Sequence, residues 1–225
     1  MNRMGRGESR LVGLTLAILV PLAALVLGWW GSAVLSMSRV LQLSARGIGL
    51  SAVTGLFLGV LLDLRFLSRW TVVFYQAPWP VLVLAYLFGS AVALAFCMGF
   101  PIGNLLWGTL AGLYVGRRQR HAGTAGRAAE ASWWKTSTLT ALVTSAEALP
   151  IGVLALQEEF AVRTLASATG LSMQVLQGSV GVAIVVGLSV ALAGIQFLCT
   201  RGAARRAYRM STGRKLTDGW RTEDH

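Results

Sequence analysis

The chain has 225 residues, of which 55% are hydrophobic and only 13% charged, with a mean hydropathy of +0.62. A soluble domain carries about 25% charged residues. The apolar residues come in blocks of about 20, separated by short basic segments, as in proteins that cross a membrane several times. This pattern excludes a disordered chain, a disulfide scaffold, a coiled coil and a soluble DNA-binding domain. The net charge of +11 therefore indicates membrane orientation rather than nucleic-acid binding.

Six apolar windows are long enough to cross a bilayer. In chain order they cover approximately residues 11–30, 47–62, 81–99, 101–116, 137–156 and 178–199. At 1.5 Å per residue they span roughly 24 to 33 Å, which matches the hydrocarbon core. The third and fourth windows meet at Pro101, between Gly99 and Gly103, which predicts a tight hairpin with a re-entrant pair as the alternative. We expect an all-α polytopic membrane protein.

In this prediction, residues 1–200 form a single compact bundle of six transmembrane helices and residues 201–225 form a basic cytoplasmic tail. With both termini in the cytoplasm, 17 of the 20 Lys and Arg residues lie inside, and only Arg39, Arg46 and Arg163 lie outside. Arg outnumbers Lys 18 to 2, which favours a GC-rich genome and the plasma membrane of a bacterium or archaeon.

The basic segments predict contact with anionic headgroups on the cytoplasmic face of the bilayer. An acidic cytoplasmic protein is the alternative partner, and no nucleic acid is expected to bind.

Small residues recur at four-residue spacing in several windows. Because helices in lipid associate through close backbone approach, such faces predict helix packing. The positions are Ser51, Gly55, Gly59, Gly89, Gly108, Gly112, Gly116 and Gly187. The alternatives are that a glycine face lines a route for a ligand or docks another membrane subunit.

Glu147 is the only one of the 29 charged residues near the middle of a predicted span. A carboxyl at that depth is costly and indicates a functional site, with a small solute or a proton as the ligand. Pro150 lies three residues further on and predicts a helix break beside the carboxyl, a device common in transporters. Two alternatives remain open. One is a structural Glu147 bonded to Thr140, Thr144 or a neighbouring helix, and the other is a shifted span that leaves it in water.

Three further residues are ligand candidates. Asn104 follows the predicted hairpin and shares a face with the glycines of its span, where it can bind a ligand or another helix. Arg39 and Arg46, with Gln42 between them, fall on one face if residues 31–46 are helical. That helix either lies on the outer membrane surface or extends span two towards an anion-attracting vestibule.

The string QEEFAVR at 157–163 contains the EExxxR pattern of intramembrane CAAX-type proteases, which also need histidines on later membrane helices. The only histidines here are His121, in a basic loop, and His225, the last residue. We therefore expect no metal site, no cofactor and no catalytic residues, and an enzyme is disfavoured.

In size, predicted span number, inside termini and small-residue faces, the chain resembles the substrate-binding subunits of energy-coupling-factor vitamin transporters. The resemblance covers topology and includes no diagnostic residue. It implies a membrane subunit that works with other membrane subunits or a cytoplasmic ATPase. The sequence thus predicts a transporter-type or substrate-binding membrane protein for a small solute, with a non-transporting assembly or accessory protein as the alternative.

Overall fold

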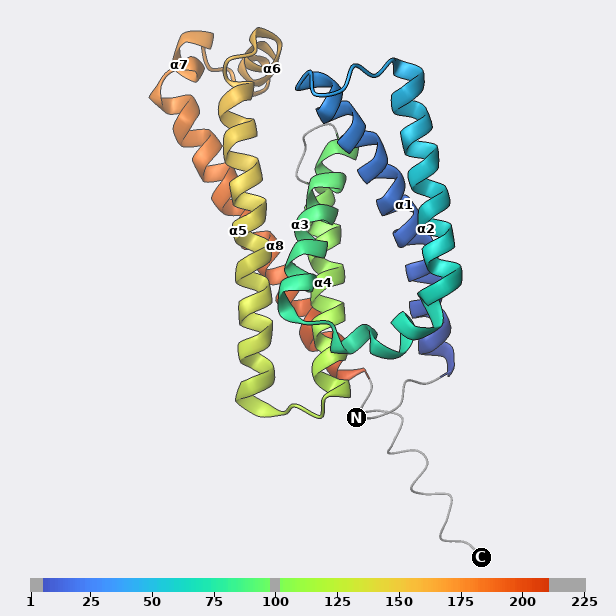
Figure 1. Ribbon diagram of the computed structural model, residues 1–225. Helices are drawn as coiled ribbons and strands as arrows, with labels where there is room; N and C mark the ends of the chain where they lie inside the picture. Colours follow the sequence, from blue (N-terminus) through green and yellow to red (C-terminus); the bar gives the residue numbers. More distant parts are fainter. Residues whose placement is uncertain (1–5, 98–101, 211–225) are drawn as a thin grey trace, which may run out of the picture. The chain divides into compact units, whose positions relative to one another are not determined.

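A computed structural model describes residues 6–97 and 102–210, and these residues are almost entirely helical and contain no strand. The helices, shown in Figure 1, are α1 (Arg6–Met37), α2 (Ala45–Val73), the 3-10 helix η1 (Phe74–Gln76), α3 (Trp79–Phe96), α4 (Ile102–His121), α5 (Gly126–Ala155), α6 (Glu159–Thr169), α7 (Met173–Gln177) and α8 (Ser179–Arg209). The expected all-α class is therefore confirmed for the described part of the chain.

The chain divides into two compact units, which we describe separately. The hairpin unit contains α1, α2 and η1, and the bundle unit contains α3 to α8. The single six-helix domain expected over residues 1–200 stays a prediction. The basic tail expected from residue 201 also stays a prediction, and the structure shows that its first part, up to Arg209, continues α8 as a helix.

In the hairpin unit, α1 and α2 pack through glycines on both helices. A Cβ on Gly55 would overlap the carbonyl oxygen of Ala24, and a Cβ on Gly28 would lie 2.5 Å from the carbonyl oxygen of Ser51. A Cβ on Gly59 would lie equally close to the Cα of Pro21. Only glycine permits such backbone contact, which is how lipid-embedded helices attract each other.

The link between α1 and α2 differs from the prediction. Residues 31–37 continue α1, and α2 begins at Ala45 after the N-cap Ser44. Arg39 lies between the two helices with a left-handed φ of 59°, which no α-helix contains. The helix expected over 31–46 is therefore wrong, and Arg39 and Arg46 do not share a helical face.

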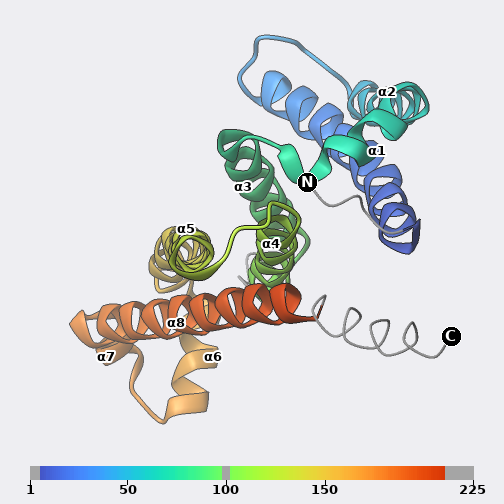
Figure 2. The ribbon, with the colours of Figure 1, turned by 90° about the horizontal axis from the view of Figure 1, so that it is seen from below.

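In the bundle unit, α8 packs on both α4 and α5, and α3 packs on α4 (Figures 1 and 2). Helices α4 and α8 meet through glycines: a Cβ on Gly112 or Gly116 would overlap the carbonyl oxygen of Thr200 or Ala204, respectively. Gly187 differs from these positions, because a Cβ there would meet no described atom within 4 Å. The packing expected at Gly187 is not found in the described residues.

The two expected helix breaks have different outcomes. Pro150 lies inside α5, which continues as a helix to Ala155, so the break expected there is wrong. Its ring nitrogen still cannot donate to the carbonyl of Ala146, one turn back. Pro101 lies outside the described residues.

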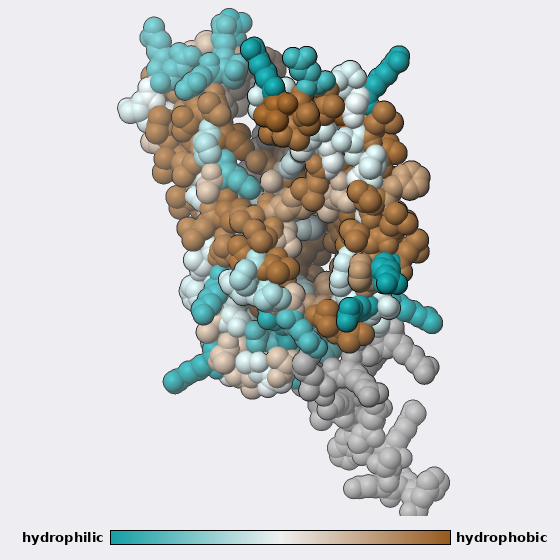
Figure 3. All heavy atoms as spheres, in the orientation of Figure 1, coloured by the Kyte–Doolittle hydropathy of each residue, from teal (hydrophilic) through white to brown (hydrophobic). Residues whose placement is uncertain are grey.

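Among the described residues, five helices are long and apolar enough to cross a membrane, and they are α1, α2 with η1, α3, α5 and α8. Helix α4 is not among these five, because Asn104 and the basic residues of its last turns make it more polar. Six spans and inside termini therefore stay predictions. On the face shown in Figure 3, hydrophobic side chains cover much of the middle of each unit, and hydrophilic side chains gather mainly towards the two ends.

Candidate functional site

The carboxylate of Glu147 on α5 is held by polar groups from two other helices. The hydroxyl of Ser90 on α3 donates to both carboxylate oxygens, at 2.9 Å to Oε1 and 3.0 Å to Oε2. The amide nitrogen of Asn104 on α4 also donates to Oε2. Ser90 and Asn104 are fully buried, whereas Glu147 is half-buried. Among the open alternatives for Glu147, the structure thus has bonds to neighbouring helices rather than to Thr140 or Thr144.

The groups around this carboxylate are neutral. No Lys or Arg in the described chain forms an ion pair with Glu147, and both of its donors are uncharged. The buried hydroxyl of Tyr86, one turn from Ser90 on α3, interacts with Thr144 on α5. One further buried oxygen beside Glu147, Oδ1 of Asn104, has no hydrogen-bond partner among the described residues. Buried polar atoms without a hydrogen-bond partner are rare in proteins unless a water molecule or a ligand bonds to them.

A second polar cluster joins α5, α8 and α4. The hydroxyl oxygens of Thr140 and Thr200 lie 3.0 Å apart, and the amide nitrogen of Gln196 donates to the Thr200 hydroxyl at 3.2 Å. All three side chains are buried. Gly108 on α4 makes room for Gln196, because a Cβ on Gly108 would overlap the Gln196 amide nitrogen. The glycine spacing of α4 therefore accommodates a polar side chain as well as a close helix.

Sequence reasoning named Glu147, Asn104, Thr140 and Thr144 but missed Ser90, Thr200 and Gln196. On α5 the polar and aromatic side chains recur at spacings of three and four, which puts them on one helical face. We call this the α5 polar face, and its members are Glu130, Trp133, Ser137, Thr140, Thr144 and Glu147. This spacing was the available signal. Gln196, a lone amide in an apolar run, was the corresponding signal on α8.

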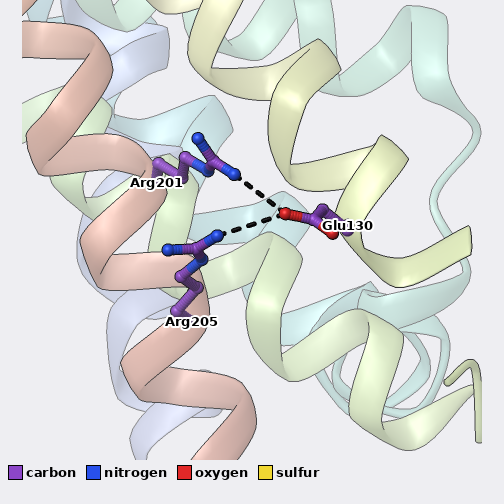
Figure 4. A network of polar contacts seen from close by, with 3 residues as sticks. All are labelled: Glu130, Arg201 and Arg205. Carbon is purple, nitrogen blue, oxygen red and sulfur yellow. Dashed lines mark hydrogen bonds and ion pairs between the residues drawn. The ribbon is translucent and has the colours of Figure 1, made fainter. Parts of the chain in front are cut away.

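The α5 polar face ends in an ion-pair cluster that joins α5 to α8 (Figure 4). Oε1 of Glu130 lies 2.8 Å from the Arg201 guanidinium and 3.1 Å from that of Arg205. Arg201 also stacks on Trp134, at 4.4 Å from the ring centroid. Basic residues thus gather at the end of the bundle unit where α8 ends. This agrees with the charge separation on which the predicted orientation depends.

A buried carboxyl in the hairpin unit was also missed. Asp63 is 6% exposed, and neither of its carboxylate oxygens has a hydrogen-bond partner among the described residues. The prediction ended span two at Leu62, whereas α2 continues to Val73 and places Asp63 well inside the helix.

The other candidates have different surroundings. Arg39 and Arg46 are exposed in the hairpin unit. Glu159 of the EExxxR string forms an exposed ion pair with Arg163 on the short helix α6. In the described part of the chain, no three His, Cys, Asp or Glu side chains come together as a metal site.

These features define the class: a helical chain with several helices long and apolar enough for a multi-pass membrane protein, and with polar side chains buried between them. No protein-family model, curated protein or solved structure matches the chain.

Proposed function

We propose that this chain is a membrane transporter, or the substrate-binding membrane subunit of one, and that Glu147 contacts a small solute or a proton. The observation that carries this proposal is a carboxylate held between three helices by neutral donors alone. A structural carboxylate in lipid surroundings is expected to have a basic partner, because an unpaired buried charge costs several kcal/mol.

The surroundings of Glu147 favour a ligand that is positively charged or donates hydrogen bonds. The carboxylate and the unpartnered Oδ1 of Asn104 can only accept hydrogen bonds. An anion would meet no basic side chain there among the described residues. A protonated amine, a small cation or a proton therefore suits the site best.

The rival function is a non-transporting accessory protein that docks other membrane proteins through its glycine faces. Gly55 and Gly59 contact α1, and Gly112 and Gly116 contact α8. These faces are thus occupied by helices of the same chain, which disfavours the rival. We propose the same setting as the sequence predicts: the protein lies in the plasma membrane, both termini are in the cytoplasm, and an ATPase is its partner.

The proposal is tested by gentle purification from native membranes followed by mass spectrometry of co-purifying small molecules and proteins. We expect the wild-type protein to carry a cationic or amine-containing solute that Glu147→Gln has lost. Glu159→Gln is the matched control, since Glu159 is an exposed acid on α6. Equal solute content in all three proteins would contradict the role of Glu147. Stoichiometric protein partners without any solute would favour the accessory function.

A further inference from the structure

The buried polar atoms that lack partners are not scattered through the bundle unit. In the described part of this unit they include Asn104 Oδ1, Trp133 Nε1, Ser137 Oγ, Gln196 Oε1 and Arg201 Nε. Trp133 and Ser137 belong to the α5 polar face, Asn104 lies on α4, and Gln196 and Arg201 lie on α8. Buried polar groups of this kind are ordinarily completed by ordered water.

The contacts place these groups in steps along the helices. Asn104 bonds to Glu147, and Gly108, one turn further along α4, contacts Gln196. Gln196 bonds to Thr200, and Thr200 to Thr140. Arg201 follows Thr200 in α8 and pairs with Glu130. One helical turn is about 5.4 Å, a gap that a single bridging water fills with two hydrogen bonds.

We propose that a file of ordered water molecules runs along the α5 polar face and delivers protons from the Glu130 end of the bundle unit to Glu147. The proposal rests on the proposed function and names the proton as a ligand of the same site. Gln196 and Ser137 are the side chains that hold the middle of the file. Both are fully buried, and each has an oxygen without a partner in the described chain.

The proton balance is simple. A proton from solvent enters beside Glu130, passes between waters and hydroxyls by exchange of hydrogen bonds, and protonates the Glu147 carboxylate. The charged groups on this route are Glu130 of α5 and Arg201 and Arg205 of α8. Helix α3 contributes no charged side chain, only the Ser90 hydroxyl and the Tyr86 phenol, and α4 has no charged side chain between Asn104 and Gly112.

Time-resolved infrared spectroscopy after a pH jump tests this route on the full chain in lipid vesicles, with the proton as the probe. The carboxyl band of Glu147 is identified by its loss in Glu147→Gln. We expect Gln196→Leu to slow the appearance of this band at least tenfold, because Leu offers neither the acceptor nor the donor with which the Gln196 amide would hold water. The final amplitude of the band stays the same.

Two further variants complete the experiment. Ser137→Ala removes one oxygen without adding volume, so it keeps the test valid if Gln196→Leu misfolds, and it slows the band several-fold. Cys199→Ala is the control, because Cys199 is an exposed free thiol on α8, and it leaves the rate unchanged. A band that rises at the wild-type rate in Gln196→Leu or Ser137→Ala overturns the water file but leaves the solute site standing. A wild-type protein that binds solute through Glu147 but shows no such band overturns proton delivery alone.

Discussion

Two pairs of helices in this molecule, α1 with α2 and α4 with α8, approach each other in the same way but enclose different chemistry. In both pairs glycines lie against backbone carbonyls of the partner helix: Gly55 against Ala24, and Gly112 against Thr200. The α4–α8 contact also includes Gln196, which lies against Gly108 and bonds to Thr200. No such side-chain hydrogen bond joins α1 and α2 along their described glycine contact.

Glycine spacing therefore determines how closely two helices approach, but not which chemical groups lie at their contact. In the α1–α2 pair, close approach supplies stability through dispersion and backbone contact. In the α4–α8 pair, the same spacing also leaves room for the Gln196 amide. This amide adds a buried polar group to those of the α5 polar face, which includes Glu147. The difference comes from the residues opposite the glycines, so function must be sought there.

The largest expected effect is on solute transport, and we expect it from a substitution in the bundle unit only. Glu147→Gln is expected to reduce uptake of the co-purifying solute into lipid vesicles by at least about tenfold, which corresponds to about 1.4 kcal/mol. Gln still accepts from Ser90, and its amide nitrogen can donate to the unpartnered Oδ1 of Asn104, so the fold persists. Glu159→Gln serves as the control, and unchanged uptake by Glu147→Gln would refute the transport role of this carboxyl.

Next in size is the effect of filling the glycine contacts. Gly112→Ala and Gly55→Ala are each expected to lower the free energy of unfolding by about 1–3 kcal/mol, because the added methyl overlaps a backbone carbonyl. Gly187→Ala is the matched control in α8: its methyl meets open space, and higher helix propensity makes it neutral or slightly stabilising. Denaturant unfolding in detergent measures all three.

The two destabilised variants sharpen the comparison further. At matched folded fraction, Gly112→Ala is expected to weaken solute binding, whereas Gly55→Ala leaves binding unchanged. Equal stability of Gly112→Ala and Gly187→Ala would show that α4 and α8 are not in glycine-mediated contact.

A smaller effect is expected from single hydroxyls. Ser90→Ala removes a donor to Glu147 and is expected to cost about 0.6 kcal/mol of unfolding free energy, the average for hydrogen bonds between membrane helices. Ser32, the counterpart in the hairpin unit, donates only to carbonyls of its own helix, at 2.7 Å to Gly28. Ser32→Ala should therefore be nearly silent. A larger loss of unfolding free energy in Ser32→Ala than in Ser90→Ala would contradict the expectation that side-chain hydrogen bonds between helices stabilise the bundle unit but not the hairpin unit.

The smallest effect concerns the ion-pair cluster at the end of the bundle unit. Glu130→Gln is expected to lower the Tm slightly at low salt and not at all at high salt, because partly exposed ion pairs are weak and screened. Thermal unfolding at two salt concentrations measures this, and a loss of stability that persists at high salt would point to a role beyond charge pairing.

Much of the helical architecture follows from the sequence. Apolar runs of membrane length and small residues at four-residue spacing predict the helices, and Glu147 was singled out by its depth in an apolar run. Helix ends were less predictable, because helices continue past the apolar core: α2 reaches Val73 and α8 reaches Arg209. That continuation is why Asp63 was placed outside its span.

The partners of Glu147 were only partly predictable. Asn104 was a candidate because an amide in an apolar helix needs a partner, but its bond to Glu147 depends on how α4 and α5 pack. Ser90 and Thr200 look like ordinary small residues in their own helices, and only the fold brings them to polar partners. Gly187 has the same spacing signal as the packing glycines, but spacing alone does not say which face of a helix meets a neighbour.

The most direct test of the account is an infrared difference spectrum of the protein in lipid, recorded with and without the co-purifying solute. Our account predicts that the solute shifts a carboxylate or carboxyl band, that Glu147→Gln abolishes the shift, and that Glu159→Gln retains it. A solute that binds equally to all three proteins, without any change in a Glu147 band, would contradict the central claim.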